Sequence, residues 1–357
     1  MANPKTPTRS TILAEDITRI LSADLPWDRL AGKTILITGA GGFLANYLVE
    51  TLLALGSRRG RGPERIIGLV RSIDRAREHF AHHRGRGEFT LVSGDVSIPT
   101  AIDGPVDFII HAASQASPKF YQVDPVGTLN ANVLGTHNML ATALEKGSQC
   151  MLFISSGEVY GQVPSESVPT AEHQFGVVDP ASVRSCYAES KRMAETMCVA
   201  WAQQFGVRSK IVRPFHTYGP GMALDDGRVF ADFVADILTR RNIVLRSDGL
   251  ATRAFCYIAD AIEGFFTVLL RGAIATPYNC GNDEAEISIR DLAQVLAREF
   301  RDRGIRAEVL PRNADDKYLP SPIARSCPNT SRLRLLGWSP RVGIAEGFRR
   351  TVTSFER

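Results

Sequence analysis

Short apolar runs alternate with longer segments of mixed polarity along the first part of the chain. The first run, Lys33–Thr38, leads into a glycine turn and an apolar helical stretch that we expect Gly56 to close. Most of the later segments between runs are long enough for crossover helices. The pattern therefore predicts an α/β fold with a doubly wound parallel sheet. The further predicted strands are Arg65–Val70, Phe89–Val92, Val106–His111, Cys150–Ser155 and Ser209–Val212.

The two ends of the chain have a different pattern. Between Ser10 and Leu30, apolar residues at helical spacing predict a short amphipathic helix before the main fold. After Pro214 the sequence mixes helices, loops and short strands. We therefore expect a helical extension at residues 1–31, the sheet domain at residues 32–214, and a smaller α/β domain at residues 215–357 with some segments returning to the sheet domain. The helical apolar positions are Ile12, Leu13, Ile17, Ile20 and Leu21.

Composition excludes several classes of protein. The 357 residues carry 42 Lys and Arg against 38 Asp and Glu, a formal charge of +4. So small a charge, spread along the chain, requires neither a nucleic acid nor an anionic membrane as partner, although small anionic ligands stay possible. The six cysteines show neither CxxC spacing nor a histidine-flanked metal pattern, and no run of about 18 apolar residues occurs. We expect reduced cysteines, no bound metal and a cytoplasmic protein.

The glycine turn has the spacing of a dinucleotide site. Gly39, Gly42 and Ala45 follow at three-residue intervals between a predicted strand and a predicted helix. Small residues let the backbone approach a pyrophosphate, and the free N–H groups at the helix start favour its negative charge. We predict a Rossmann-type NAD(P)-binding domain, and a plain turn between strand and helix is the alternative. The predicted contacts at this turn are Gly39, Gly42, Phe43 and Leu44.

The end of the second predicted strand lacks the carboxylate that usually holds the adenosine ribose of NAD. Val70 and Arg71 occupy this position. Arg71 could pair with the 2′-phosphate of NADP, or lie over the adenine with NAD bound. Asp95, after the third strand, could accept a hydrogen bond from the adenine amine or cap a turn. We also place Val96 and Ala112 among the cofactor-binding residues.

Three side chains have the chemistry for proton transfer to and from a hydroxyl group. Tyr187 and Lys191 lie four residues apart on one face of a predicted helix. A lysine ammonium lowers the pKa of a neighbouring phenol, so that tyrosinate can take a hydroxyl proton while hydride leaves for the cofactor. Ser156 follows a predicted strand and would share a hydrogen bond with the reacting hydroxyl. A surface pair without function is the alternative for this Tyr-x-x-x-Lys spacing.

The order of these motifs resembles the extended short-chain dehydrogenase/reductase family, in particular its nucleotide-sugar epimerases, dehydratases and decarboxylases. The resemblance covers about residues 32–353 and includes the NVLGT and TYGPGM segments. Among the branches, the sequence is most similar to UDP-glucuronate decarboxylases, which make UDP-xylose. The matching segments are His111–Pro118, Arg184–Cys198, Asp225–Phe233 and Thr252–Asp260.

The resemblance implies a reaction and residue roles. Enzymes of this branch oxidise C4 of a UDP-linked sugar with bound NAD, lose CO2 from the β-keto acid and return the hydride. By resemblance, Tyr187 is the base, Lys191 its partner and Ser156 the hydroxyl donor. Glu158 is a substrate-side acid/base, and Arg253 is a substrate-side cation that could stabilise an enolate. The implied substrate contacts are Ser114, His216, Arg228, Val229 and Arg253.

Departures from the decarboxylase pattern leave the reaction after C4 oxidation open. Gly157 stands where these enzymes tend to have serine, His216 replaces the usual Asn before the T-x-G-P turn, and Gly221 replaces an arginine after it. Because Gly157 removes a proton donor and leaves space, an epimerase acting at C4 or C5 is the alternative. A 4,6-dehydratase is less favoured, since elimination needs an acid and a base and only Glu158 is present. A silent nucleotide-binding scaffold is the alternative from a different class.

The resemblance also bears on cofactor and assembly. A cofactor that is re-reduced in place gains nothing from matching the reducing pool of the cell, so we expect NAD despite Arg71. Two long predicted helices, Val123–Lys146 and Arg184–Phe205, carry apolar positions that related proteins pair into a four-helix interface. We therefore expect a homodimer. The apolar positions are Met139, Leu140, Met193, Met197 and Trp201.

Overall fold

A seven-stranded parallel sheet forms the centre of the molecule. In this computed structural model, which describes residues 9–310 and 323–356, the strands follow the order β11-β6-β5-β4-β1-β2-β3. The order runs outward in both directions from β1 and β4, as in a doubly wound sheet. The fold class predicted from the apolar runs is confirmed. The strands are β1 (Thr34–Thr38), β2 (Arg65–Val70), β3 (Phe89–Ser93), β4 (Phe108–His111), β5 (Cys150–Ile154), β6 (Ser209–Pro214) and β11 (Pro277–Cys280).

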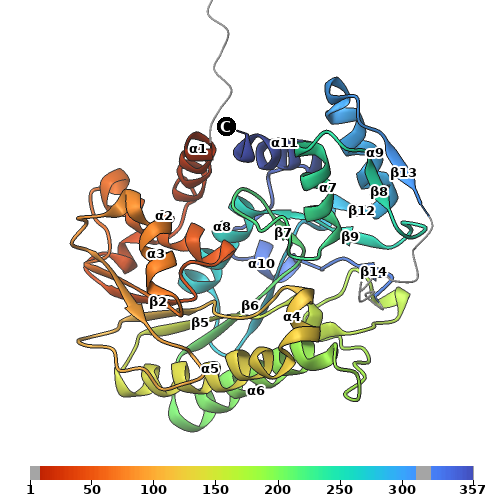
Figure 1. The fold of residues 1–357 in the computed structure, drawn as a ribbon. Coiled ribbons are helices and arrows are strands. Elements are labelled where there is room, and N and C mark those ends of the chain that lie inside the picture. The colour runs from red at the N-terminus through yellow and green to blue at the C-terminus, as the bar shows by residue number, and fades with distance from the viewer. Residues whose placement is uncertain (1–8, 311–322, 357) are drawn as a thin grey trace, which may run out of the picture.

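Helices cover both faces of this sheet (Figure 1). On one face lie α5 (Pro125–Glu145) and α6 (Ser185–Phe205), and on the other lie α2 (Phe43–Arg59), α3 (Ile73–His79) and α8 (Ile258–Arg271). The central strands β1 and β5 are buried along their whole length, which explains their continuous apolar runs. The shorter helical segments of this part are η1 (Trp27–Leu30), η2 (Ala81–His83), α4 (Pro118–Val123), η3 (Gly157–Tyr160) and η4 (Ser165–Ser167).

Helix α2 continues past its predicted end at Gly56. It ends at Arg59, and Gly60, with φ +75°, adopts the left-handed conformation that closes it. Gly56 serves close packing instead, since a Cβ atom on Gly62 would lie 2.8 Å from the Gly56 backbone. The prediction of Gly56 as the cap was wrong, because a glycine marks a helix end only where the backbone takes a positive φ.

Beyond residue 215 the chain builds small sheets beside the carboxyl ends of the main strands. Strand β7 pairs with β10, β8 pairs with β13, and β12, β9 and β14 form a three-stranded sheet. The chain also returns to the main sheet, since β11 pairs with β6 and α8 packs against the sheet. The division into a sheet domain at residues 32–214 and a smaller α/β domain at residues 215–357 stays a prediction. The elements are β7 (Thr217–Tyr218), α7 (Val229–Leu238), β8 (Ile243–Leu245), β9 (Thr252–Ala254), β10 (Cys256–Tyr257), η5 (Asp283–Ala285), β12 (Glu286–Ser288), α9 (Ile289–Glu299), η6 (Arg301–Arg303), β13 (Ala307–Val309), β14 (Arg325–Ser326), α10 (Ser331–Arg334) and α11 (Ile344–Phe355).

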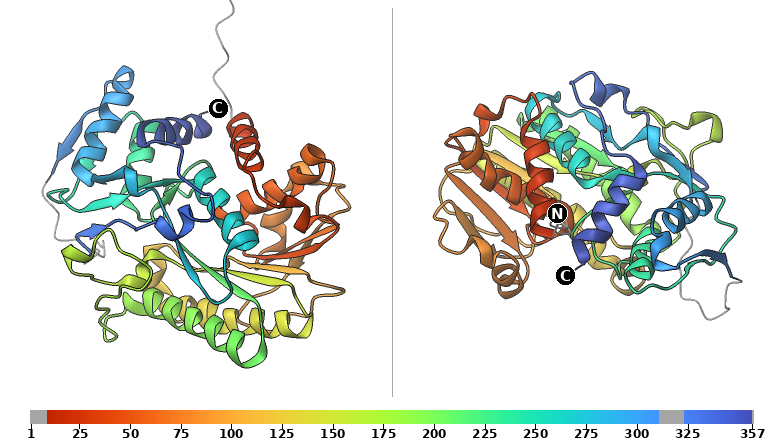
Figure 2. Two further views of the ribbon diagram at one scale, coloured as in Figure 1. Left: turned by 180° about the vertical axis from the view of Figure 1, so that it is seen from behind. Right: turned by 90° about the horizontal axis from the view of Figure 1, so that it is seen from above.

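The predicted N-terminal helix is α1 (Arg9–Leu21), which packs against α2, α8 and α11 (Figures 1 and 2). Asp16 on this helix is buried. Its carboxylate accepts hydrogen bonds from Tyr47 in α2, Tyr257 in β10 and Arg350 in α11. The extension therefore joins the sheet domain to the last helix of the chain. Its predicted apolar face is buried at Ile12, Ile17, Ile20 and Leu21.

The cysteines and helices bear on the expectations from composition. All six cysteines are free and buried, as expected for reduced thiols. Within the described ranges, no helix combines the length and the apolar character needed to cross a bilayer.

Candidate active site

A cleft of about 1110 Å³ lies between the carboxyl ends of the main strands and the small sheets. Ligands of doubly wound folds bind at this edge of the sheet. Its volume is slightly above the usual range for ligand pockets, about 300–1,000 Å³, and leaves room for two ligands such as a cofactor and a substrate. Residues distant in sequence thus meet in one cavity. The predicted site residues that line it are Gly39, Gly42, Phe43, Leu44, Ala112, Ser114, Ser156, Glu158, Tyr187, Lys191, His216, Arg228, Val229 and Arg253.

The glycine turn has a backbone that fits a pyrophosphate. Gly39 has φ +67°, and a Cβ atom there would lie 2.9 Å from the Cα of Ala113. Gly42 is the N-cap of α2, and no side chain in the described part of the chain caps that end. The first N–H groups of α2 can therefore bind an anion, and Phe43 and Leu44 beside them line the cleft.

Three predicted cofactor residues, Arg71, Asp95 and Val96, lie outside the described lining of the cleft. One carboxylate oxygen of Asp95 accepts hydrogen bonds from the N–H and the hydroxyl of Ser97, at 2.9 and 2.7 Å, which is the turn-capping arrangement. Burial raises the pKa of Asp95, but these hydrogen bonds outweigh it and hold the pKa below its ordinary value. The contacts of the three residues with the adenosine half stay predictions.

Tyr187 lies near the start of α6, where its hydroxyl forms a hydrogen bond with Ser156, the N-cap residue of η3 two positions after β5. The ring is buried and stacks on Tyr121, with centroids 5.2 Å apart. Burial raises the pKa of Tyr187, although the hydrogen bond with Ser156 and the charge of Arg228 lower it. Burial thus opposes the lowered pKa of Tyr187 that we expected from the neighbouring Lys191. The phenol is therefore protonated at neutral pH.

Lys191 is buried one helical turn after Tyr187. Its ammonium group donates a 2.8 Å hydrogen bond to the carbonyl of Ile154 and lies 4.7 Å from the centre of the Phe153 ring. Burial lowers the pKa of Lys191 to about 7, against the opposing effect of Glu195. Near neutral pH, a charged ligand bound beside Lys191 can therefore change the fraction of this lysine that is protonated.

A buried ion pair that was not predicted from the sequence lies behind Lys191. Glu195 accepts hydrogen bonds from the Arg213 guanidinium at 2.9 and 2.6 Å. It also accepts one from Ser155, the residue before Ser156. The four-residue spacing from Lys191 to Glu195 was a usable signal. The pairing with Arg213 could not be predicted from the sequence, because Glu195 lies on α6 and Arg213 lies on β6.

Glu158 lies in η3 next to a cation, Arg184, that was not among the predicted site residues. The Arg184 guanidinium is 3.9 Å from the Glu158 carboxylate, and both residues line the cleft. The Glu158 side chain is 32% exposed, so solvent reaches it. Its charge also acts on Tyr187 and raises the pKa of the phenol. A carboxylate and a cation therefore lie beside the hydroxyl groups of Ser156 and Tyr187.

His216 has an unusual backbone conformation. Its φ of +28° lies in the left-handed region, where Asn and His occur more often than most residues, and this explains why His can replace the usual Asn. Its Nε2 lies 3.1 Å from the Ser326 hydroxyl. Burial, together with the charges of Arg253 and Arg228, lowers the pKa of His216 well below its ordinary value. The ring is therefore neutral and suited to hydrogen bonding.

Arg253 lies on β9 at the wall of the cleft. Its guanidinium donates hydrogen bonds to the carbonyls of Thr252 and Ile323 at 2.7 and 2.8 Å. The arginine that acts on the Tyr187 hydroxyl is Arg228. The predicted role of Arg253 beside an enolate stays a prediction.

Gly157 does not leave the free space that the sequence suggested. The Phe215 ring packs against it, and a Cβ atom on Gly157 would lie 2.9 Å from two atoms of that ring. A side chain at position 157 therefore requires Phe215 to move.

We expect Gly157→Ser to destabilise the protein. Overpacking against a buried side chain such as Phe215 typically costs about 1–3 kcal/mol, which should lower Tm by a few degrees in scanning calorimetry. Gly87→Ser is the matched control, because a Cβ atom at Gly87 meets nothing within 4 Å. Equal Tm values for the two variants would contradict the steric argument.

Together, the doubly wound sheet, the glycine cradle and the Ser–Tyr–Lys set define a nicotinamide-dependent enzyme of the short-chain dehydrogenase/reductase type. The model of the NAD dependent epimerase/dehydratase family matches residues 35–281, and the chain belongs to this family. The predicted extended type and the predicted cofactor, NAD, are confirmed.

Several relatives have names that describe a reaction. The chain is 36% identical to UDP-glucuronic acid decarboxylase 2 of Arabidopsis thaliana, over 91% of this chain and 69% of that protein. It is 37% identical to UDP-glucuronic acid decarboxylase 1 of Danio rerio, over 91% of this chain and 73% of that protein. The solved structure of UDP-glucuronic acid 4-epimerase from Bacillus cereus, in complex with UDP-glucuronic acid and NAD, matches 90% of this chain and 98% of that one with a TM-score of 0.73. At 20% identity, this last likeness shows the fold alone.

Proposed function

We propose that the protein decarboxylates UDP-glucuronate, oxidising C4 of the sugar and reducing it again after CO2 has left. The observation that carries the proposal is the 36% identity, over 91% of the chain, to a UDP-glucuronic acid decarboxylase. The meeting of Ser156, Tyr187 and Lys191 in one cleft supports it, because these side chains can remove and return a hydroxyl proton.

The charge of the cleft suits an acidic nucleotide sugar. The described lining contains more arginines than acidic residues. The acidic residues are Glu158, Asp232 and Asp236, of which Asp236 pairs with Arg241 at 3.0 Å. UDP-glucuronate carries a diphosphate and a carboxylate, and an excess of arginine attracts both groups. The arginines of the described lining are Arg184, Arg228, Arg241, Arg246 and Arg253.

In the first step, the chain moves a proton from the C4 hydroxyl. Tyr187 accepts this proton and Ser156 holds the reacting oxygen by a hydrogen bond. Because burial raises the pKa of Tyr187, formation of tyrosinate depends on positive charge nearby. Arg228 supplies such a charge, and the Lys191 ammonium lies 5.9 Å from the centre of the Tyr187 ring. NAD, when bound, takes the hydride from C4 and later returns it.

Loss of CO2 follows from the chemistry of the 4-keto sugar. The bond between C5 and the carboxylate carbon breaks, and its electron pair moves onto the C4 oxygen to form an enolate. Ser156 and the protonated Tyr187 can donate hydrogen bonds to that oxygen. A proton then returns to C5, and we assign Glu158 as its donor because it stands at the cleft wall beside Tyr187.

The test is incubation of the purified protein with UDP-glucuronate, UDP-glucose and dTDP-glucose, followed by mass spectrometry of the products. We expect CO2 release and UDP-xylose from UDP-glucuronate alone. Isomerised UDP-glucuronate without loss of CO2 would assign the protein to the epimerases. No turnover of any substrate, with cofactor bound, would favour the silent scaffold.

An epimerase is the second candidate because Gly157 places no hydroxyl beside Ser156. The Phe215 ring occupies the adjoining space. If Glu158 instead removes the C5 proton of the 4-keto acid, the carboxylate stays in place, and return of a proton to the other face of the enolate gives the C5 isomer. The product analysis separates these outcomes, since only decarboxylation releases CO2.

We expect Glu158→Gln to separate the two halves of the reaction. The amide keeps the size and the polarity of the carboxylate but cannot transfer a proton, so the variant should oxidise C4 and then stall. Stopped-flow absorbance should show NADH accumulating, and product formation should fall by about 10²-fold or more. Glu189→Gln on α6 is the control, because Glu189 pairs with Arg192 and does not line the cleft. Full product formation by Glu158→Gln would refute its assignment.

We further propose a cytoplasmic homodimer formed through α5 and α6. These helices lie side by side on the outside of the sheet (Figure 1), and exposed apolar residues on them support the proposal. Met139 and Leu140, which the sequence suggested for the interface, are buried in the core of the subunit instead. Sedimentation of the purified protein tests the dimer. The exposed apolar residues are Leu129, Leu134, Leu144, Met193, Val199 and Phe205.

A further inference from the structure

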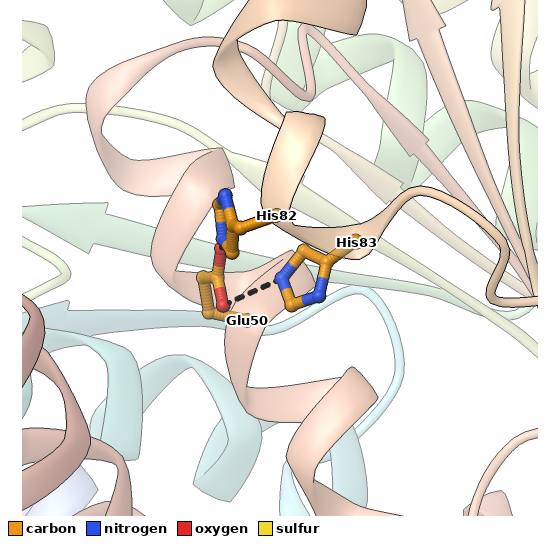
Figure 3. Close-up of side chains that lie close together, drawn as sticks. All are labelled: Glu50, His82 and His83. Atoms are coloured by element: carbon orange, nitrogen blue, oxygen red, sulfur yellow. Dashed lines mark hydrogen bonds and ion pairs between the residues drawn. The ribbon is translucent and has the colours of Figure 1, made fainter.

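Outside the cleft, two histidines meet on one carboxylate of α2 (Figure 3). Glu50 belongs to α2, and His82 and His83 belong to η2. The Nε2 of His82 lies 2.9 Å from one carboxylate oxygen, and the Nε2 of His83 lies 2.9 Å from the other. The reaction proposed above does not use these three side chains.

The Glu50 carboxylate lacks a permanent cation. Its side chain is only 7% exposed, and both of its oxygens face imidazole nitrogens. Among the described residues, no Lys or Arg forms an ion pair with it, whereas most buried carboxylates are paired with a cation or bind a metal. A bound divalent ion would supply the missing positive charge.

We propose that Glu50, His82 and His83 bind a zinc ion. Their three donor atoms lie within 4.8 Å of one another. Ligand atoms about 2.1 Å from a tetrahedral zinc ion are about 3.4 Å apart, so small side-chain rotations would admit the ion. Two imidazole nitrogens and one carboxylate oxygen form a zinc ligand set with a fourth position for water, whereas Mg²⁺ and Ca²⁺ prefer oxygen ligands alone.

One histidine of the Glu50–His82–His83 cluster is open to solvent, from which an ion can enter, and the other is fixed by packing against aromatic side chains. The His82 side chain is 55% exposed, whereas that of His83 is 11% exposed. Phe80 and Phe89 pack beside His83, each with its ring centre 6.4 Å from the imidazole. The ion would tie η2 to α2, the helix whose first turn forms the cofactor cradle. The sequence-based expectation of no metal rested on cysteine and histidine patterns, which do not include Glu50.

The test uses the full chain, freed of any histidine tag and stripped of metal by a chelator, and titrated with ZnCl2. Calorimetry and elemental analysis should give one zinc ion per chain, and zinc should raise Tm by a few degrees. Cobalt(II) serves as a spectroscopic probe of the unmutated protein, because tetrahedral coordination gives a strong visible absorbance. No bound zinc and no such absorbance would overturn the proposal without the use of any variant.

Variants locate the ion. Changing a residue that only supports a metal ligand weakens binding about 10- to 100-fold, so loss of a direct ligand in Glu50→Gln or His83→Ala should weaken it by at least about 100-fold. His82→Ala is the variant that endangers folding least, since its side chain is largely exposed. His173→Ala is the control, because His173 is an exposed histidine outside the cluster. Zinc affinity that falls equally in His82→Ala and His173→Ala, or in neither, would contradict the site.

Discussion

Tyr187→Phe is expected to lower turnover of UDP-glucuronate by about 10²- to 10⁴-fold while NAD stays bound and the fold stays intact. The change removes the hydroxyl that bonds to Ser156 but keeps the ring stacked on Tyr121. Without that hydroxyl, no group at this position can accept the C4 proton. Steady-state rates measure the loss of turnover, and the nucleotide released on denaturation measures cofactor retention.

Tyr121→Phe is a matched control for this prediction. Tyr121 is the stacked neighbour of Tyr187, and its hydroxyl donates a 3.0 Å hydrogen bond to the carbonyl of Ala116. The control thus removes a buried phenol hydroxyl that has no assigned part in proton transfer. An equal loss of turnover in the two variants, or near-normal turnover of Tyr187→Phe, would show that Tyr187 is not the acid/base.

Lys191→Met is expected to impair both turnover and cofactor retention. Methionine fills much of the lysine volume but supplies no charge beside Tyr187 and no hydrogen bond to the Ile154 carbonyl. The tyrosinate then loses a stabilising cation, and the rate should fall by about 10²-fold or more. Lys210→Met is the control, since Lys210 is also buried, donates to the Leu269 carbonyl and does not line the cleft. Unchanged rate and unchanged NAD affinity in Lys191→Met would rule out the role of Lys191.

The same variant should change how stability depends on pH. Because burial lowers the pKa of Lys191 to about 7, the unfolded chain binds a proton that the folded protein lacks between pH 7 and the ordinary pKa of lysine, about 10.4. The Lys191 side chain therefore makes the free energy of unfolding rise with pH in this window and contributes no slope below it. We expect the difference in free energy of unfolding between the unmutated protein and Lys191→Met to rise from pH 7 to pH 10 in urea titrations. A flat difference would contradict the lowered pKa.

Two details show why sequence patterns fail at particular positions. Gly56 has the sequence character of a helix end, but a neighbouring backbone segment passes over it and the helix ends at Arg59. Gly157 suggests open space, but the Phe215 ring fills that space from another strand end. In both cases, glycine accommodates a contact with a residue that the local sequence does not reveal.

The sequence by itself determined the doubly wound sheet, the glycine turn and the spacing of Tyr187 and Lys191, because apolar periodicity, backbone permissiveness and helical repeat are local properties. Only the tertiary structure decided that burial raises the pKa of Tyr187, that Arg213 pairs with Glu195 behind the lysine, and that His82 and His83 face Glu50. These features depend on desolvation and on contacts between separate elements. Their partners lie too far apart along the chain for any periodic pattern to connect them.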